Sequence, residues 1–316
     1  MKKSLFRVIC VVLLLLVCAG SALAAPEMLV PGGCTVGIKL QMKGLLVTQV
    51  EEGSAAEAAG MKKGDIITQV NGQSAETAQF LKQSIDEHPV ALMVLRGGKE
   101  AQFLVTPKQR KLGLHIRDSV AGIGTVTYYD PVTGDFGALG HGVNEASSGQ
   151  PVPVEGGALI ESSVVEVKKG KAGTPGELKG TFDLEKILGQ VEQNCDHGIY
   201  GTMSNPLSRK PLPVAQTDEI RTGKATILSN VSGKDIQTYT VEILKLYPEA
   251  QESGRNMLLK VTDKDLLRAT GGIVQGMSGS PILQNGKLVG AVTHVLVNDP
   301  TRGYGIFIEN MLDAAG

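Results

Sequence analysis

The sequence contains no tryptophan, and no run of five or more like charges occurs in its 316 residues. Lysine and arginine total 31 and aspartate and glutamate total 32, so the formal net charge is -1. Proteins that bind nucleic acid normally carry a concentrated basic patch. The charge pattern therefore argues against a nucleic-acid partner, and we predict none.

Cysteine is scarce, with four residues at positions 10, 18, 34 and 195. Two of them lie in the N-terminal segment, which leaves Cys34 and Cys195 as a pair that could form outside the cytoplasm. One pair in a chain of this length is not a disulfide scaffold. The run Cys195-Asp196-His197 brings two kinds of metal ligand together, but no second cluster completes a zinc pattern. We therefore predict neither a metal nor another cofactor.

Residues 1–25 have the order of a secretory signal. Basic residues at positions 2, 3 and 7 precede an uncharged aliphatic stretch from Val8 to Gly20, and Ala22-Leu23-Ala24 supplies a cleavage motif before Ala25. The apolar stretch is shorter than the ~20 residues of a membrane-spanning helix. The alternative is an uncleaved N-terminal anchor. In both cases we expect the remainder of the chain to be exported across the membrane.

The remaining composition predicts a folded, mostly β protein. Hydrophobic residues make up 42% and charged residues 20%, and 40 glycines provide turns between Val-rich, Ile-rich and Thr-rich segments. A chain of this length holds about two domains at ~150 residues each. We place one at residues 31–108 and a larger one at residues 109–316.

The first domain resembles a PDZ domain, and the stretch GSAAEAAGMKKGDIITQVNG (residues 53–72) carries the resemblance. Such domains bind a peptide by adding it as a strand to an open sheet edge, while loop amides receive its end. The resemblance implies that residues 77–87 form a helix on the other side of the groove. It also implies a peptide-binding loop formed by Thr35, Val36, Gly37 and Ile38, with Ile38 to Gln41 as the open edge.

The second domain contains the stretch TGGIVQGMSGSP (residues 270–281), in which glycines flank Ser278. This pattern is typical of a chymotrypsin-like nucleophile turn, because glycines let the backbone bend sharply. The amides of Gly276 and Ser278 would then form an oxyanion hole, the pair of donors that stabilises the negative oxygen of the intermediate. A serine hydroxyl also needs a base within hydrogen-bond reach.

Five histidines are present, and His141 is the preferred base. It ends the segment FGALGHG (residues 136–142), where two glycines leave room beside the imidazole. His294 lies in the strand that follows the nucleophile hairpin and is the alternative. His88, His115 and His197 have surface or structural interpretations.

The third catalytic residue is less defined by the sequence. A carboxylate normally holds the imidazole in the correct tautomer. Asp218, Asp235, Asp263 and Asp265 all lie near turns, and Asp263 comes just before the nucleophile segment. An equally good interpretation makes Asp263 the N-cap of a short helix over residues 264–268. A Ser-His dyad without an acid also remains open.

The combination of export signal, PDZ domain and nucleophile turn resembles the stage IV sporulation protein B family. The segment GALGHGV and the segment TGGIVQGMSGSPILQNGKLVGAVTHVLVNDPT carry this resemblance. It implies a PDZ domain followed by a chymotrypsin-like double β-barrel, with Ser278 as nucleophile, His141 as base and Asp263 as orienting acid.

The same resemblance implies a role in endospore formation. A peptidase of this kind acts in the intermembrane space between forespore and mother cell, at least transiently associated with a membrane. It cuts its own N-terminal region and the regulatory subunit of an intramembrane protease complex, which then processes a late mother-cell sigma factor. The PDZ domain would bind a peptide ligand and control self-cleavage. The alternative is a non-catalytic PDZ adaptor on a degenerate protease shell.

Overall fold

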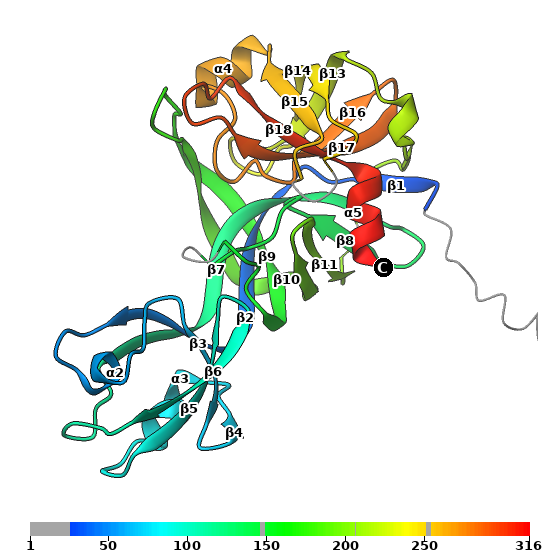
Figure 1. Ribbon diagram of the computed structural model, residues 1–316. Coiled ribbons are helices and arrows are strands. Elements are labelled where there is room, and N and C mark those ends of the chain that lie inside the picture. The colour runs from blue at the N-terminus through cyan, green and yellow to red at the C-terminus, as the bar shows by residue number, and fades with distance from the viewer. Residues whose placement is uncertain (1–25, 146–148, 206, 251–253) are drawn as a thin grey trace, which may run out of the picture.

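The computed structural model describes residues 26–145, 149–205, 207–250 and 254–316 (Figure 1). The predicted signal segment, residues 1–25, lies outside the described residues. Strands dominate the described chain, which confirms the prediction of a mostly β protein. None of its described helices is long and apolar enough to span a bilayer.

The PDZ module is the lower part of the molecule in Figure 1. Its apolar core joins the second half of β2 to the strands and helices that follow it, and to the first residues of β7. The elements are β2 (Thr35–Val50), α2 (Ala55–Ala58), β3 (Ile66–Val70), β4 (Gln73–Ser74), α3 (Ala78–Gln83), β5 (Val90–Arg96), β6 (Lys99–Val105) and β7 (Leu114–Tyr129).

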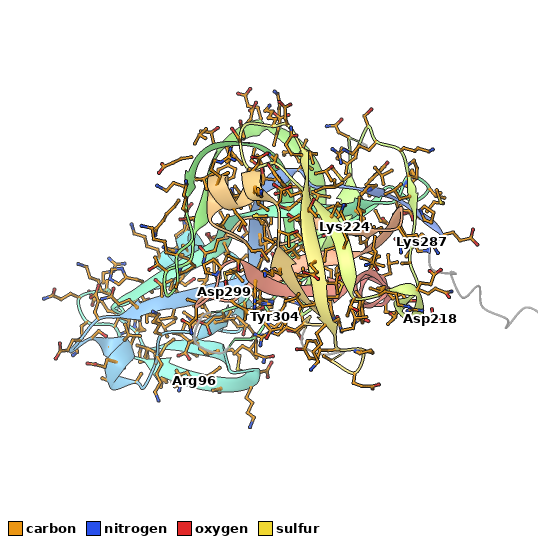
Figure 2. The ribbon with its side chains drawn as sticks, turned by 90° about the horizontal axis from the view of Figure 1, so that it is seen from above. Arg96, Asp218, Lys224, Lys287, Asp299 and Tyr304 are labelled. Atoms are coloured by element: carbon orange, nitrogen blue, oxygen red, sulfur yellow. The ribbon has the colours of Figure 1, made fainter. Side chains whose placement is uncertain are left out.

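The GMKKGD turn of this module is held by a buried carboxylate. Asp65 is 1% exposed, and Arg96, labelled in Figure 2, donates to both of its oxygens at 2.6 and 2.7 Å. The same guanidinium donates to the Gly60 carbonyl at 2.9 Å. A bidentate pair of this kind has a defined geometry, so it sets how the turn meets β5.

The first barrel is closed by β2 and β7 themselves. β7 pairs with β8, β8 with β11, β11 with β10, β10 with β9, β9 with β2, and β2 again with β7. The six pairings return to their starting strand. The strands added to those already named are β8 (Asp135–Ala138), β9 (Val154–Lys168), β10 (Glu177–Cys195) and β11 (Gly198–Met203), and β1 (Met28–Pro31) and β12 (Leu212–Pro213) extend the sheet.

The second barrel closes in the order β13-β14-β15-β18-β17-β16 and lies at the top of Figure 1. Its strands are β13 (Gly223–Ser229), β14 (Gln237–Leu246), β15 (Met257–Val261), β16 (Pro281–Gln284), β17 (Lys287–Val295) and β18 (Arg302–Phe307). The remaining elements are the 3-10 helix η1 (Thr217–Glu219) and the helices α4 (Lys264–Thr270) and α5 (Ile308–Ala315). Two six-stranded barrels are therefore present, as predicted.

The border between the modules differs from the predicted one at residue 31. Val30, Val36 and Leu40 are buried in the core of the first barrel, whereas Leu45 is buried in the PDZ core. The PDZ module is therefore inserted into the first barrel. The first half of β2 and the second half of β7 belong to the barrel, whereas the second half of β2 and the first residues of β7 belong to the PDZ module. The sequence could not show this, because one long strand can pack against two cores in succession.

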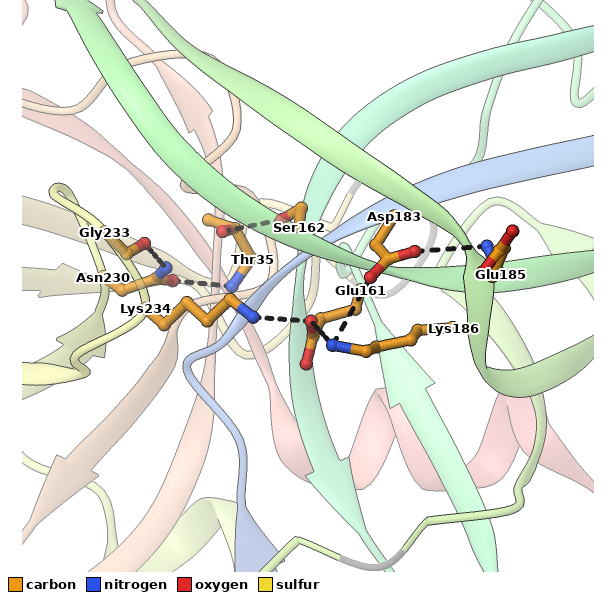
Figure 3. A network of polar contacts seen from close by, with 9 residues as sticks. All are labelled: Thr35, Glu161, Ser162, Asp183, Glu185, Lys186, Asn230, Gly233 and Lys234. Atoms are coloured by element: carbon orange, nitrogen blue, oxygen red, sulfur yellow. Dashed lines mark hydrogen bonds and ion pairs between the residues drawn. The ribbon is translucent and has the colours of Figure 1, made fainter.

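A polar network joins the two barrels beside β2 (Figure 3). The Thr35 amide donates to Asn230 Oδ1 at 2.6 Å, and Ser162 donates to the Thr35 hydroxyl at 3.0 Å. Lys234 of the second barrel reaches Glu161 of β9 at 2.5 Å. These contacts fix the start of β2 against both barrels.

Candidate functional site

The turn that carries Ser278 lies between α4 and β16, and glycines shape it. Gly276 and Gly279 have φ angles of +98° and +95°, in the region that side chains rarely adopt. A Cβ on Gly279 would lie 2.0 Å from the Thr125 carbonyl oxygen. Glycine is required at position 279 for this second, steric reason as well.

Two buried threonines of β7 hold this turn from the first barrel. The Thr125 amide donates to the Ser278 carbonyl at 2.9 Å, and the Thr125 hydroxyl donates to the Gly276 carbonyl at 2.7 Å. The Thr127 hydroxyl donates to the Gly279 carbonyl at 2.9 Å. Both threonines are 0% exposed. The sequence does not predict this role for them, because nothing in it links residues about 150 positions apart.

The turn leaves two amides available. Met277 and Ser280 donate to the carbonyls of Val274 and Met277, and Gly279 donates to Val292. Within the described parts of the chain, the amides of Gly276 and Ser278 donate to no protein acceptor. These are the two amides that the sequence analysis predicts as an oxyanion hole.

Ser278, Gly276 and His141 line one cavity of about 410 Å³ between the barrels. Its wall includes four consecutive residues of β7 and the end of β17. The lining residues are Ile38, Leu40, Val120, Ala121, Gly122, Ile123, Leu139, His141, Gly142, Val143, Asn144, Ile273, Val274, Gln275, Gly276, Ser278, Thr293, His294 and Val295. The structure therefore brings together residues that lie 137 positions apart in the sequence, Ser278 and His141.

His141 follows β8 through a left-handed turn in which Leu139 and Gly140 have φ angles of +70° and +71°. Its Nδ1 lies 2.8 Å from the Gly142 carbonyl oxygen. Because a carbonyl only accepts, this contact places the proton on Nδ1 and leaves Nε2 as an acceptor. Burial holds the pKa of His141 below its ordinary value, so the imidazole is neutral near pH 7. Both properties suit a general base.

His294 lies beside His141, with 5.0 Å between the ring centroids. Burial, together with the charge that His141 and Arg255 can carry, lowers its pKa to about 4. Its Nδ1 is buried and has no hydrogen-bond partner among the described residues. The Ser278 hydroxyl donates to the Thr293 carbonyl at 2.8 Å, next to this second histidine. Proton transfer to His141 therefore requires the Ser278 hydroxyl to turn away from Thr293.

Asp263 does not line this cavity. Its carboxylate accepts hydrogen bonds from the amides of Asp265, Leu266 and Thr240 at 3.0, 3.0 and 3.2 Å. Desolvation by burial raises the pKa of Asp263, but the three hydrogen bonds outweigh this effect and hold the pKa below its ordinary value. It is the N-cap of α4, which is the alternative interpretation in the sequence analysis. The group that meets His141 Nδ1 is the Gly142 carbonyl, so an orienting role for Asp263 stays a prediction.

The predicted peptide-binding loop is wrong. Thr35, Val36, Gly37 and Ile38 belong to β2, and this part of β2 is paired on both sides, with β7 and with β9. The segment from Ile38 to Gln41 is therefore not an open edge, and the Thr35 amide already donates to Asn230.

Another cavity, named the peptide groove below, lies elsewhere in the PDZ module. A cavity of about 530 Å³ lies between α3 and the first residues of β7. Its apolar walls are Leu81, Ile85, Leu114 and Ile116, and the turn from Gln109 to Gly113 closes one end. A helix is present within the predicted range, α3 (Ala78–Gln83), and the strand beside this cavity is the last of the module and not the first.

A sequence signal for this groove was available. The run Lys111-Leu112-Gly113-Leu114 has the Leu-Gly-apolar centre of the common Gly-Leu-Gly-Phe loop. Lys108 and Lys111 close the turn with reciprocal backbone bonds of 3.0 Å. The amides of Leu112 and Gly113 have no acceptor in the described residues, so they are available to a ligand.

Cys34 and Cys195 are both free, and burial raises the pKa of the Cys34 thiol to about 11. In the described part of the chain, no group of three or more His, Cys, Asp or Glu side chains is arranged to hold a metal ion.

Two curated relatives match parts of the chain. A putative zinc metalloprotease of Vibrio cholerae is 32% identical over 158 residues, which is 48% of this chain and 34% of that protein. The putative serine protease HhoB of Synechocystis is 37% identical over 68 residues, which is 20% of this chain and 16% of that protein. The chain thus spans about a third or less of the length of these relatives.

Solved structures that match part of this chain include the Rv3671c protease of M. tuberculosis. Its active form is 16% identical, with a TM-score of 0.35, and the match covers 62% of this chain and 75% of that one. Its inactive form is 15% identical, with a TM-score of 0.33, and the match covers 61% and 84%.

The family assignment follows from matches to the two modules described above. The PDZ domain family matches residues 46–96, inside the inserted module. The SpoIVB peptidase S55 family matches residues 108–312, which is most of the chain. The match includes the second barrel and the part of the first barrel that follows the PDZ module. The chain belongs to the SpoIVB peptidase S55 family of serine peptidases and carries a PDZ domain.

Proposed function

We propose that this protein is a serine endopeptidase in which Ser278 is the nucleophile and His141 the general base. One observation carries the proposal. Ser278 and His141, which is protonated on Nδ1, line a single cavity together with Gly276, and the amides of Gly276 and Ser278 donate to no acceptor in the described residues. A nucleophile, a base and an oxyanion hole are the parts that acyl transfer needs.

The reaction starts when the Ser278 hydroxyl leaves the Thr293 carbonyl and attacks the substrate carbonyl carbon. Nε2 of His141 takes the hydroxyl proton, and the new negative oxygen accepts hydrogen bonds from the amides of Gly276 and Ser278. His141 then gives the proton to the leaving amine, which breaks the C–N bond and leaves an acyl-enzyme. Water, activated by the same imidazole, hydrolyses the ester and restores Ser278.

The Gly142 carbonyl replaces the acid of a triad in this scheme. It accepts from Nδ1 and so keeps the tautomer that a base requires. A neutral carbonyl stabilises the imidazolium less than a carboxylate does. We therefore describe the site as a Ser-His dyad, with Asp263 shaping the segment that precedes the nucleophile turn.

Ser278→Ala tests the proposal. A fluorophosphonate, which reacts only with an activated serine, should label the wild-type protein at Ser278 and leave the alanine variant unlabelled. Losing the nucleophile typically costs ~10⁶ in rate, so cleavage of casein should disappear while the circular dichroism spectrum is unchanged. Absence of labelling in wild-type protein, beside a control protease that is labelled, would favour the PDZ adaptor instead.

The biological setting forms the second part of the proposal. Family membership supports a role in endospore formation, with cleavage of its own N-terminal region and of the regulatory subunit of an intramembrane protease complex. The basic and apolar pattern of residues 1–25 supports export to the space between forespore and mother cell, with transient membrane association. Mass spectrometry of the exported protein beside its Ser278→Ala form would report self-cleavage and signal processing together.

A further inference from the structure

One strand links the two cavities described above. Residues Leu114 and Ile116 of β7 line the peptide groove, and residues 120–123 of the same strand line the cavity that contains Ser278. Two residues later, Thr125 holds the nucleophile turn. β7 runs through all these positions as a single element of 16 residues, from the PDZ module into the first barrel (Figure 1).

β7 has a strand partner on only one side between these two cavities. It pairs with β2 from Leu114 to Arg117 and from Ser119 to Thr125, with an irregularity at Asp118, whereas β8 and β1 begin to pair with it at Val126 and Tyr128. No other described strand pairs with its second edge from residue 114 to residue 125. An unpaired edge of this length is a template for an added strand.

Hydrogen bonds identify which residues face the unpaired edge. The Thr125 amide donates to Ser278, away from β2, whereas the Val126 amide donates to Cys34 on the β2 side. The register between β2 and β7 is unbroken from residue 125 to residue 119. Because backbone groups alternate along a strand, Ile123, Ala121 and Ser119 present their N–H and C=O groups to the same side as Ser278.

The catalytic cavity meets this edge directly. Neighbouring residues of a strand point their side chains to opposite faces, so a cavity on one face contacts every second residue. Val120, Ala121, Gly122 and Ile123 all line the cavity, which is expected when it lies along the edge of the strand. A Cβ on Gly122 would meet nothing within 4 Å, so one face of the strand is also open at this position.

The charge of the groove defines which end of a peptide it accepts. Arg110 and Lys111 are exposed at the closed end, where the amides of Leu112 and Gly113 are available, and Lys82 of α3 is exposed beside them. Glu51 also lines the groove, but it is paired with His115 at 3.2 Å. Basic side chains and free amides suit a terminal carboxylate, and the apolar walls suit an apolar last side chain.

We propose that the unpaired edge of β7 binds one extended segment of a protein substrate along its whole length, with the free C-terminus in the PDZ groove and the scissile bond at Ser278. The inference deepens the proposed peptidase function and rests on it.

The closed end of the groove lies at the start of β7, so the bound segment runs antiparallel to this strand. From Leu114 to Ile123 is about nine residues at ~3.3 Å each, or ~30 Å. Cleavage is therefore set at about ten residues before the C-terminus.

Binding to the Ser278→Ala protein tests the edge without any need for catalysis. The probe is a fluorescein-labelled peptide of fifteen residues, seven Ser-Thr repeats followed by Val with a free carboxylate, compared by anisotropy with its last six residues alone. The long probe should bind about tenfold or more tightly, which corresponds to one or two net hydrogen bonds. A C-terminal amide should weaken both probes. Equal affinity of the two lengths, indifference to the amide, or no binding of either probe would each overturn the proposal.

Ala121→Pro distinguishes the contribution of the β7 edge to binding from that of the peptide groove. Ala121→Pro removes an N–H that faces away from β2, so the ladder with β2 is kept, and proline is tolerated at strand edges. This variant should lose the tighter binding of the long probe, whereas Ala121→Ser retains the N–H and should keep it. The six-residue probe reports whether the PDZ module remains folded. A folded Ala121→Pro protein that still prefers the long probe would contradict the proposal.

Cleavage of the same probe distinguishes this inference from the peptidase assignment. Protein with Ser278 intact should cut the fifteen-residue peptide about ten residues from its C-terminus, as measured by mass spectrometry. Cutting at positions unrelated to the C-terminus would overturn the edge proposal alone. Length-dependent binding by a protein that neither cleaves casein nor reacts with a fluorophosphonate at Ser278 would overturn the peptidase function and leave the edge proposal standing.

Discussion

The hydroxyl of Thr125 is expected to control how well the nucleophile turn is organised. Thr125→Val keeps the shape of this fully buried side chain but removes the 2.7 Å bond to the Gly276 carbonyl. No other described group donates to that carbonyl, so the variant leaves a buried acceptor unsatisfied. Such a loss costs about 1–3 kcal/mol in the free energy of unfolding. The bond from the Thr125 amide to Ser278 is retained.

The same change is expected to lower the rate. The Gly276 carbonyl belongs to the peptide unit between the two oxyanion donors, so releasing it lets their directions diverge. Complete loss of one donor costs ~10²–10³ in kcat, which is the upper limit for this variant. We expect kcat to fall by about tenfold to a hundredfold with little change in KM, since the substrate groove is untouched.

The assay combines fluorophosphonate labelling of Ser278, cleavage of casein and urea unfolding. Thr125→Ser is the matched control, because it keeps the hydroxyl and loses only a methyl group. Labelling of Thr125→Val at the wild-type rate would refute the reasoning. So would equal losses in the valine and serine variants, which would show that packing and not the hydrogen bond matters.

Three further predictions concern single residues of the site. Gly279→Ala should abolish labelling and destabilise the protein, because the new Cβ would lie 2.0 Å from the Thr125 carbonyl oxygen; a soluble, fully labelled variant would contradict this. Asp263→Ala should cost about 1 kcal/mol in urea unfolding as a lost N-cap, while Asp263→Asn retains most of the cap; a ~10⁴ loss of kcat in a stable asparagine variant would instead support the orienting role. The pKa of His294 falls from 6.5 to about 4 on folding, so the unfolded chain binds its proton first. Stability should therefore be complete above pH 6.5 and decline toward pH 4, and His294→Gln should flatten this decline in melts at constant ionic strength; an unchanged slope would mean that other groups dominate.

Several features could be read from the sequence because their causes are local. The glycines beside Ser278 and the turn at Gly140-His141 depend on backbone conformations that few other residues adopt, so they mark the proposed nucleophile and the proposed base directly. The GMKKGD stretch marks the PDZ module, because Asp65 and Arg96 make a defined pair within it. The role of Asp263 was ambiguous because local sequence does not distinguish two functions. An N-cap and an orienting acid can be the same residue type at the same place in a turn.

The groove was misplaced because strand exposure is not a local property. Residues 35–38 and residues 114–117 both read as strands close to glycine, and only pairing distinguishes them. β9 covers the first segment, whereas the second keeps an open edge beside α3. The run Lys111-Leu112-Gly113-Leu114 lies beyond the boundary at residue 108, so dividing the chain there separated the loop from its module.

The order of residues in this chain determines its class, its two modules, the bend at Ser278 and the turn that presents His141, since each depends on side chains within a few positions of one another. The tertiary structure alone decided which edge of which strand is open, which carbonyl meets the imidazole, and that Thr125 holds the nucleophile turn from the other barrel. The physical reason is that hydrogen-bond partners and solvent exposure in a β protein are set by strands distant in sequence, and a single strand such as β7 can serve two modules at once.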